Sequence, residues 1–399
     1  MKDEKKAPKL RFKGFTDDWE QVKYGEIFQR RSKMDVSTPA LPSVEYDDIN
    51  PGMGTLNKEP KSKVTSKRGI HFNPGDVLFG KLRPYLKNWL FACFEGVAVG
   101  DFWVLTSSKI DHGFTYSLIQ APEFQYIANL SSGSKMPRSD WGLVSNARTF
   151  IPTNLSEQKS ISSVLFGLDT AITLHEDKKR QLERIKSALL QKMFANKSEY
   201  PAIRFEGFSA EWEQYKLGDV ANFSKGTGYS KSDLKGTGSP IILYGRLYTK
   251  YETIIRNVDT FVVPKSGSVF SKGGEVIVPG SGETAEDISI ASVVEPAGIL
   301  LGGDLNIIYP NSDLDPAFLA ITISNGKPHF DMARRAQGKS VVHLHNADLK
   351  HILLKTPNLS EQKRISKIFE SLDQTITLHD QKLSFLKRLK QTLLQKMFI

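Results

Sequence analysis

Leu155-Ser156-Glu157-Gln158-Lys159 opens the stretch that decides this fold, and Leu189-Leu190-Gln191-Lys192-Met193-Phe194 closes it. The same block returns over residues 359–398 at a constant offset, without a gap and with more than half of its positions identical. An internal repeat of this length and fidelity sets the plan of the whole chain. The protein therefore has two halves that end in copies of one element.

Each copy of the repeat is predicted to form one long helix. Its apolar residues recur mostly at alternating steps of four and three, which is typical of a coiled-coil seam. The seam residues are Ile161, Leu165, Leu168, Ile172, His175, Lys179, Leu182, Leu189 and Met193 in the first copy, and Ile365, Phe369, Leu372, Ile376, His379, Leu383, Leu386, Leu393 and Met397 in the second. Ser156 and Ser360 are expected to cap the first turns. We expect the two seams to pack against each other, in preference to two unrelated core helices.

The order of the elements predicts an antiparallel helix pair. Each helix then returns the chain to the end where the next domain begins. Equivalent antiparallel helices are related by a local two-fold axis near their midpoints, which fall at His175 and His379. We therefore expect the two imidazoles to face each other, because a polar seam residue fixes register at some loss of stability. The alternative is that each ring points to solvent.

Composition describes a globular, basic chain of 399 residues with 39% hydrophobic and 25% charged residues. The net charge of +10 favours a polyanionic partner, most simply nucleic acid, although a merely soluble basic protein has the same balance. The one cysteine, Cys93, excludes an intrachain disulfide and a cysteine zinc site. The sequence has neither a signal peptide nor an apolar run near the ~20 residues of a membrane span, so we expect a cytoplasmic protein without a membrane partner.

A second repeat opens each half and delimits the domains. Residues 8–15 lead to Trp19, and residues 201–208, with the same Arg-Phe-x-Gly-Phe pattern, lead to Trp212. Between each opener and its helix lie short apolar strands bounded by Gly, Pro or Asp, and then a helical segment. The predicted fold class is α+β, with two pseudo-repeated mixed α/β domains separated by two long helices that pair as an antiparallel coiled coil. The expected bounds are 1–154 and 196–358 for the domains, and 155–195 and 359–399 for the helices.

No catalytic motif is found in the sequence. There is no Gly-x-Gly-x-x-Gly after a strand, no Walker loop and no His-Glu-x-x-His. The glycines of residues 280–284 lack the Lys-Ser/Thr that would reach phosphates. His345 and His351 lie near His343 without a further group of ligands, so we expect no metal site. The sequence gives no positive reason to regard the chain as an enzyme.

Binding signals are clearer than catalytic ones. Cations alternate with aromatic residues over residues 80–89, a pattern that suits phosphates and bases. The alternative is a solvated surface. The candidate DNA-binding residues are Lys81, Arg83, Tyr85, Lys87, Lys135, Arg138 and Ser139 in the first half, and Lys225, Tyr229, Lys231, Lys339, Ser340 and His343 in the second.

The two divergent domains, the near-identical helices that open with Asn-Leu-Ser-Glu-Gln, and the Gly-Lys-Leu-Arg-Pro-Tyr-Leu-Lys stretch together resemble the specificity subunits of type I restriction-modification systems. The resemblance covers essentially the whole chain. It implies that each variable region is a target recognition domain for one half of a split site in double-stranded DNA. It also implies that the helices hold the domains apart and dock two methylation subunits. The second domain departs from the pattern, because Val-Pro-Gly-Ser-Gly at 278–282 replaces the Lys-Leu-Arg-Pro stretch.

The same resemblance implies partners and a division of labour. The methylation subunits would carry S-adenosylmethionine, translocase-endonuclease subunits would join for cleavage, and this chain would hold neither a cofactor nor a catalytic site. Two other hypotheses stay open at this point. One is a stand-alone DNA methyltransferase or nuclease, and the other is a coiled-coil scaffold with no role on DNA.

Overall fold

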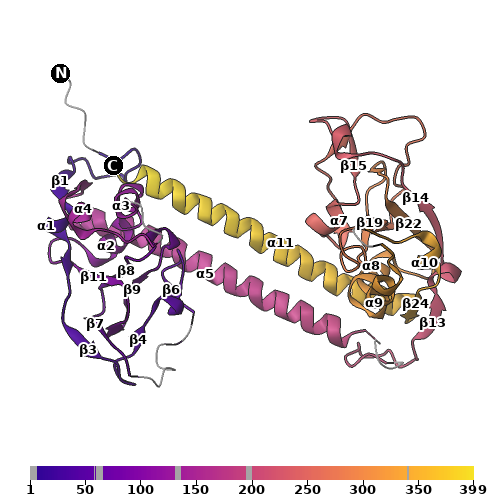
Figure 1. The fold of residues 1–399 in the computed structure, drawn as a ribbon, viewed down its shortest axis with the longest axis horizontal. Coiled ribbons are helices and arrows are strands. Elements are labelled where there is room, and N and C mark those ends of the chain that lie inside the picture. The colour runs from indigo at the N-terminus through magenta and orange to yellow at the C-terminus, as the bar shows by residue number, and fades with distance from the viewer. Residues whose placement is uncertain (1–6, 58, 60–65, 131–135, 195–199, 339–340) are drawn as a thin grey trace. The chain divides into compact units, whose positions relative to one another are not determined.

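The computed structural model describes residues 7–57, 59, 66–130, 136–194, 200–338 and 341–399. The chain divides into two compact units, one formed by residues 1–178 with 379–399 and the other by residues 179–378. Both long helices, α5 (Leu155–Lys192) and α11 (Leu359–Lys396), pass through the boundary between the units. Each unit therefore contains one variable domain and a segment of each helix (Figure 1).

The first domain is built on two four-stranded sheets, with strand orders β3-β7-β10-β4 and β2-β11-β8-β9. Strands β8 and β11 are buried along most of their length, because they come from the apolar runs Val-Leu-Phe-Gly and Phe-Trp-Val-Leu-Thr. The elements are β1 (Glu20–Lys23), α1 (Tyr24–Ile27), β2 (Gln29–Arg30), β3 (Met34–Val36), β4 (Ser43–Val44), β5 (Ile49–Asn50), β6 (Thr55–Leu56), β7 (Arg68–Phe72), β8 (Val77–Gly80), β9 (Trp89–Phe91), β10 (Gly96–Ala98), β11 (Phe102–Thr106), α2 (His112–Leu118), α3 (Pro122–Ala128), α4 (Trp141–Asn146) and β12 (Arg148–Ile151).

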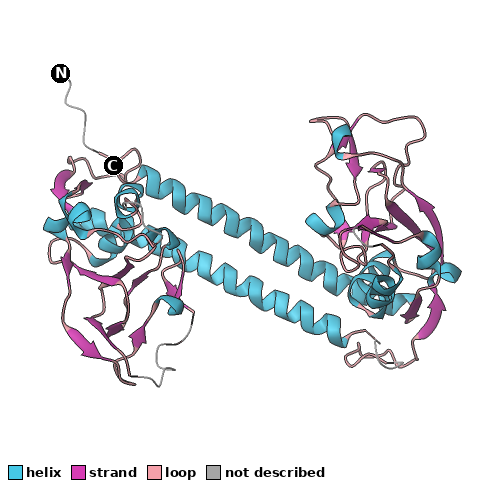
Figure 2. Ribbon diagram, viewed as in Figure 1, coloured by secondary structure: helices cyan, strands magenta, loops and turns pink. Residues whose placement is uncertain are grey.

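The second domain repeats this frame with different loops. Its main sheet has the order β14-β22-β18-β20-β16, and β13 pairs with β24 as β1 pairs with β12. Figure 2 shows strands only in the two variable domains, as the predicted α+β class requires. The elements are β13 (Glu213–Lys216), α6 (Leu217–Val220), β14 (Ala221–Lys225), β15 (Ser239–Ile242), α7 (Arg246–Thr249), β16 (Ile254–Ile255), β17 (Phe261–Val262), β18 (Glu275–Pro279), β19 (Ser281–Gly282), β20 (Ser292–Val294), β21 (Leu300–Leu301), β22 (Leu305–Pro310), α8 (Pro316–Asn325), α9 (Lys327–Arg335), β23 (Val342–His343), α10 (Asn346–Lys350) and β24 (Leu353–Thr356).

The openers dock on the starts of the long helices through buried ion pairs. The Arg11 guanidinium makes a two-pronged contact with Glu157, at 2.6 Å from Nε and 2.8 Å from its second nitrogen. Arg204 makes the equivalent contact with Glu361, at 2.7 Å for both bonds. Both carboxylates are almost completely buried. The acidic residue of the Leu-Ser-Glu-Gln motif therefore holds the opener in place.

The predicted caps at Ser156 and Ser360 are wrong. The helices begin one residue earlier, so the capping position falls on Asn154 and Asn358. The Asn154 side-chain oxygen accepts a hydrogen bond from the Ser156 amide at 2.8 Å, and that of Asn358 accepts one from the Glu361 amide at 3.0 Å. Asparagine caps a helix as well as serine does.

In each unit a segment of α5 lies beside a segment of α11 in antiparallel orientation (Figure 1). In the first unit, Asp169 contacts Lys390 at 2.5 Å and Glu176 contacts Lys387 at 2.6 Å, so residue numbers rise on one helix as they fall on the other. Their midpoint histidines meet as the two-fold argument predicted, with 2.8 Å between the Nδ1 atoms of His175 and His379.

Each helix ends in a domain core. Met397 and Phe398, at the end of α11, pack in the core of the first unit, where Phe398 meets the edge of the Trp19 ring. Met193 and Phe194, at the end of α5, pack likewise in the second unit against Trp212. The identical Leu-Leu-Gln-Lys-Met-Phe endings of the repeat are thus core anchors. No helix in the described part of the chain is apolar enough over sufficient length to cross a bilayer.

Candidate nucleic-acid interface

The two basic loops predicted in the first domain come together as one structure. Leu82 and Arg138 form an antiparallel bridge. On either side of it, the Arg83 amide donates to the Pro137 carbonyl and the Ser139 amide donates to the Lys81 carbonyl, both at 2.8 Å. Lys81, Arg83 and Arg138 therefore belong to a single two-stranded basic segment, which we call the basic edge (residues 81–87 with 136–139).

Tyr46 holds the basic edge onto the sheet. Its hydroxyl accepts a hydrogen bond from the Leu82 amide at 3.0 Å and donates to the Asp101 carbonyl at 2.6 Å. Burial raises the pKa of Tyr46 to about 12, so the hydroxyl remains a neutral donor at physiological pH. Arg83 and Lys87 flank the short turn Pro84–Leu86 in the left-handed backbone region, with φ of 49° and 59°. The loop is therefore built in one defined conformation.

Charge on the basic edge is only partly neutralised. Asp101 contacts the Arg138 guanidinium at 3.0 Å and the Lys81 ammonium at 3.6 Å. Tyr85 is 55% exposed, and Lys87 is exposed beside it. These side chains are available for contact with a polyanion.

Two predicted residues of the first domain do not fit this surface. Ser139 is buried, and its hydroxyl donates to the Ala128 carbonyl at 2.7 Å, so it stabilises the loop and is not placed to reach DNA. Lys135 lies outside the described residues.

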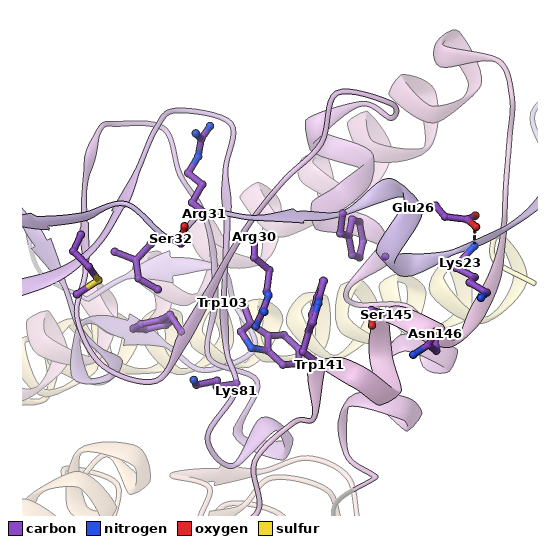
Figure 3. Close-up of a pocket in the computed structure, with 15 residues that line it drawn as sticks. Lys23, Glu26, Arg30, Arg31, Ser32, Lys81, Trp103, Trp141, Ser145 and Asn146 are labelled. Atoms are coloured by element: carbon purple, nitrogen blue, oxygen red, sulfur yellow. Dashed lines mark hydrogen bonds between the residues drawn. The ribbon is translucent and has the colours of Figure 1, made fainter.

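A hollow of about 950 Å³ adjoins the basic edge. Its lining includes Lys23, Arg30, Arg31 and Lys81, against one carboxylate, Glu26. Figure 3 shows Arg30 beside the indole rings of Trp103 and Trp141, and its guanidinium carbon lies 4.6 Å from the centre of the Trp141 ring. The hollow thus combines positive charge with aromatic surface, which suits phosphates and bases.

Sequence reasoning identified Lys81 but missed the other cations of the hollow. Arg30 and Arg31 stand side by side in the sequence shortly after the first helical turn. Two adjacent arginines are only a weak indication of a binding site. Arg31 is held by the buried carboxylate of Asp76 at 2.5 Å, so its role is partly structural. Arg30 comes next to Trp141 only through the packing of β2 against α4, which no local pattern encodes.

Each candidate DNA-binding residue of the second domain has its own set of neighbouring residues. Lys225 and Lys231 are exposed. The Tyr229 hydroxyl lies 2.5 Å from the Ser268 hydroxyl, and the Lys265 ammonium lies 4.6 Å from the centre of the Tyr229 ring. His343 is exposed on β23, which pairs with β19. Lys339 and Ser340 lie outside the described residues.

The loop around Tyr229 is stabilised by an ion pair. The Lys265 ammonium lies 2.7 Å from Asp233, and this contact, with the Ser230 amide, lowers the pKa of Asp233 to about 2. The Tyr229 hydroxyl accepts a hydrogen bond from the Lys265 amide at 2.7 Å, so Tyr229 also helps to hold the loop that carries Lys231. Among the described residues, no group of three or more histidine, cysteine or acidic side chains is arranged to hold a metal ion.

Comparison with known proteins points to one family. The family model described as "Type I restriction modification DNA specificity domain" matches residues 209–388. The "Type I restriction enzyme MjaVIII specificity subunit" of Methanocaldococcus jannaschii is 19% identical over 321 residues, which are 77% of this chain and 71% of that protein.

The chain is similar in fold to a solved structure. The S subunit of a type I restriction-modification system from M. genitalium is 15% identical, with a TM-score of 0.64, and the match covers 98% of this chain and 99% of that one. The HsdS subunit from Thermoanaerobacter tengcongensis is 18% identical, with a TM-score of 0.44 over 95% of this chain and 96% of that one.

Proposed function

We propose that this chain is a specificity subunit of a type I restriction-modification system, and that each of its variable domains reads one half of a bipartite site in double-stranded DNA. The match of a DNA specificity domain to residues 209–388 carries this proposal. The first half repeats the same frame, since β2-β11-β8 corresponds to β14-β22-β18. A repeated frame with different loops suits two readers of two different half-sites.

The charge of the chain supports a DNA partner. A net charge of +10 attracts a polyanion, and the basic edge together with the hollow gathers cations and aromatic rings on the first domain. Contacts to phosphates set the position of a protein on the duplex, while contacts to base edges specify sequence. The exposed Lys87 and Tyr85 are suited to contact phosphates, and Arg30 is suited to contact a base edge.

In this proposal the chain supplies recognition and contributes no catalysis. Two methylation subunits, which would bind S-adenosylmethionine, dock on the helices, and translocase-endonuclease subunits join the same complex. The repeat of one helix sequence in α5 and α11 supports this stoichiometry, because two copies of one surface suit two copies of one partner. The continuous helices would set the length of the unread spacer between the half-sites.

Mapping the methylated bases of the host genome, with and without this gene, tests the proposal. A bipartite methylated motif should disappear when the gene is deleted and return when it is supplied again. An unchanged methylation map would contradict the proposal. Incubation of the purified chain alone with labelled S-adenosylmethionine and DNA should transfer no methyl group, whereas a stand-alone methyltransferase would transfer it.

A salt series separates DNA recognition from a scaffold role. The assembled complex should bind duplex DNA with an affinity that falls steeply as salt rises, because binding to phosphates releases counterions. A scaffold with no role on DNA would show no such binding at any salt concentration.

A further inference from the structure

The two domains share a corner where a strand residue stacks with a residue of a short helix. In the first domain, Arg30 on β2 lies over Trp141 on α4, with 4.6 Å from the guanidinium carbon to the ring centre. In the second domain, Phe223 on β14 lies under Lys350 on α10, with 5.6 Å from the ammonium to the ring centre. We call this place the strand–helix corner.

Strand register shows that the two corners are equivalent. Arg30 pairs with Leu105 on β11, and Phe223 pairs with Ile308 on β22, the corresponding strand of the second domain. The helices correspond as well. The Tyr24 amide donates to the carbonyl just after α4 at 3.1 Å, and the Leu217 amide donates to the carbonyl two residues after α10 at 2.8 Å. Arg30 and Phe223 thus occupy the same position of one repeated frame.

The strand residues Arg30 and Phe223 are equivalent, but their partners come from different positions of the two helices, because Lys350 corresponds to Ser145 and not to Trp141. The strand supplies the cation and the helix supplies the ring in the first domain, whereas the strand supplies the ring and the helix supplies the cation in the second. The backbone frame is kept while the side chains differ in kind. Different side chains at one strand position of a shared frame, exposed for Arg30 and partly buried for Phe223, suit two domains that read different half-sites.

We propose that the strand–helix corner contacts duplex DNA in both domains, with an arginine that reads a base edge in the first and a lysine that binds a phosphate in the second. This inference rests on the proposed function, because it assigns the contacts within it. It gives Arg30 and Trp141 a defined role and extends the surface to Phe223 and Lys350, and none of the four is among the candidate DNA-binding residues named above.

Arg30 has the properties of a base-reading residue. In the described part of the chain it pairs with no carboxylate, whereas its neighbour Arg31 is neutralised by Asp76. Stacking on Trp141 restrains the planar guanidinium, so less conformational freedom is lost when it binds. An arginine fork matches the O6 and N7 acceptors of guanine in the major groove. The expected target is therefore a guanine in the first half-site.

Lys350 has the properties of a phosphate contact. Its ammonium is a compact charge on a flexible stem, which binds phosphate without the planar match that base reading needs. It is exposed, and Lys225 lies two residues after Phe223 on β14, on the same face of the strand. The second corner therefore offers two cations beside one ring.

The test uses the complete complex and two readouts, fluorescence anisotropy with duplex DNA and mapping of methylated bases. Arg30→Ala should weaken binding to the wild-type site roughly 5- to 150-fold, the size of one lost bidentate base contact. It should also relax one position of the first half-site and leave the second unchanged. Arg30→Lys keeps the charge and should show the same loss of discrimination.

Lys350→Ala should weaken binding to all duplexes alike and reduce the slope of log affinity against log salt by about 1. The matched controls are Arg148→Ala, an exposed arginine of β12 outside the hollow, and Lys327→Ala, an exposed lysine of α9 outside the long helices. Thermal unfolding of each variant checks that it is folded.

The proposal is overturned if the Arg30 and Lys350 variants bind and methylate like their controls while the wild-type complex keeps its bipartite specificity. The proposed function would survive that result. Absence of specific DNA binding by the wild-type complex would instead overturn the proposed function together with this inference.

Discussion

Single residues join each opener to its long helix. Glu157 is 1% exposed and receives both prongs of the Arg11 guanidinium as well as the Trp19 ring N–H, at 3.3 Å. Glu361 receives Arg204 in the same way. A buried carboxylate with this many donors depends on its partner, because removal of the arginine leaves an uncompensated charge in the core.

Arg11→Ala is therefore expected to lower the free energy of unfolding by about 3–5 kcal/mol. Arg204→Ala should act in the same direction. The control is Glu183→Ala, which removes the exposed contact between Lys179 and Glu183 on α5 and should cost less than about 1 kcal/mol. Urea unfolding followed by circular dichroism measures all three. An Arg11 variant as stable as the control would show that the pair contributes nothing.

The charges of the basic edge are expected to contribute to DNA binding. Lys81→Glu and Arg83→Glu should each weaken DNA binding and flatten its dependence on salt, because fewer counterions are released from the phosphates. The matched control is Lys159→Glu, an exposed lysine on α5. Anisotropy titrations at several salt concentrations provide the measurement. If both variants bind like the control at every salt concentration, the loop is only a solvated surface.

At the scale of the element, charged pairs and one histidine pair set the register of the helices. Asp169 with Lys390 and Asp373 with Lys186 are equivalent positions of the repeat, and both pairs cross between α5 and α11. Lys390 is 9% exposed and also donates to Gln120 at 2.6 Å, which ties the helix to the first domain. A shift of register would separate these partly buried charges, so the pairs favour one alignment of the helices over its neighbours.

The histidine pair makes the helices sensitive to acid. Burial, and after it the nearby His175 ring, lowers the pKa of His379 below its ordinary value of 6.5. Lys382 and Lys178 act in the same direction, and Asp380 opposes them. The unfolded chain takes up a proton near pH 6.5 while the folded chain resists it. The stability that neutral His379 contributes is thus fully present above pH 6.5 and declines as the pH falls through the lowered pKa.

We accordingly expect the free energy of unfolding to fall more between pH 7.5 and pH 5.5 in the wild type than in a His175→Gln/His379→Gln double variant. The two uncharged amides can still hydrogen-bond across the seam, and they do not titrate. Urea unfolding at both pH values gives the difference. Equal losses in the two proteins would remove the histidine pair as the cause.

At the scale of the whole molecule, the repeat joins two readers by two continuous helices. An insertion of four residues in both helices adds roughly one turn, or ~6 Å. We expect the half-sites to stay unchanged and the unread spacer to grow by about one or two base pairs, since the duplex rises ~3.4 Å per pair. Mapping of methylated bases reads both quantities. A changed half-site with a constant spacer would show that the helices do not set the spacer length.

Replacement of residues 25–149 by the same domain of a relative should have the opposite effect. One half-site should change, and the spacer and the other half-site should stay as they are. The same methylation map provides the measurement, with the unaltered second half-site as the internal control. Loss of both half-sites would show that the domains do not read independently.

The sequence by itself determined the long helices, their antiparallel pairing and the meeting of His175 with His379. Helical hydrogen bonds join residues four apart, so a period of alternating fours and threes is enough to predict the helix and its buried face. Only the tertiary structure joined residues 81–87 to 136–139, brought Arg30 onto Trp141 and set Arg11 on Glu157. These contacts link residues far apart in the chain, and they depend on strand pairing and domain packing that no local pattern encodes.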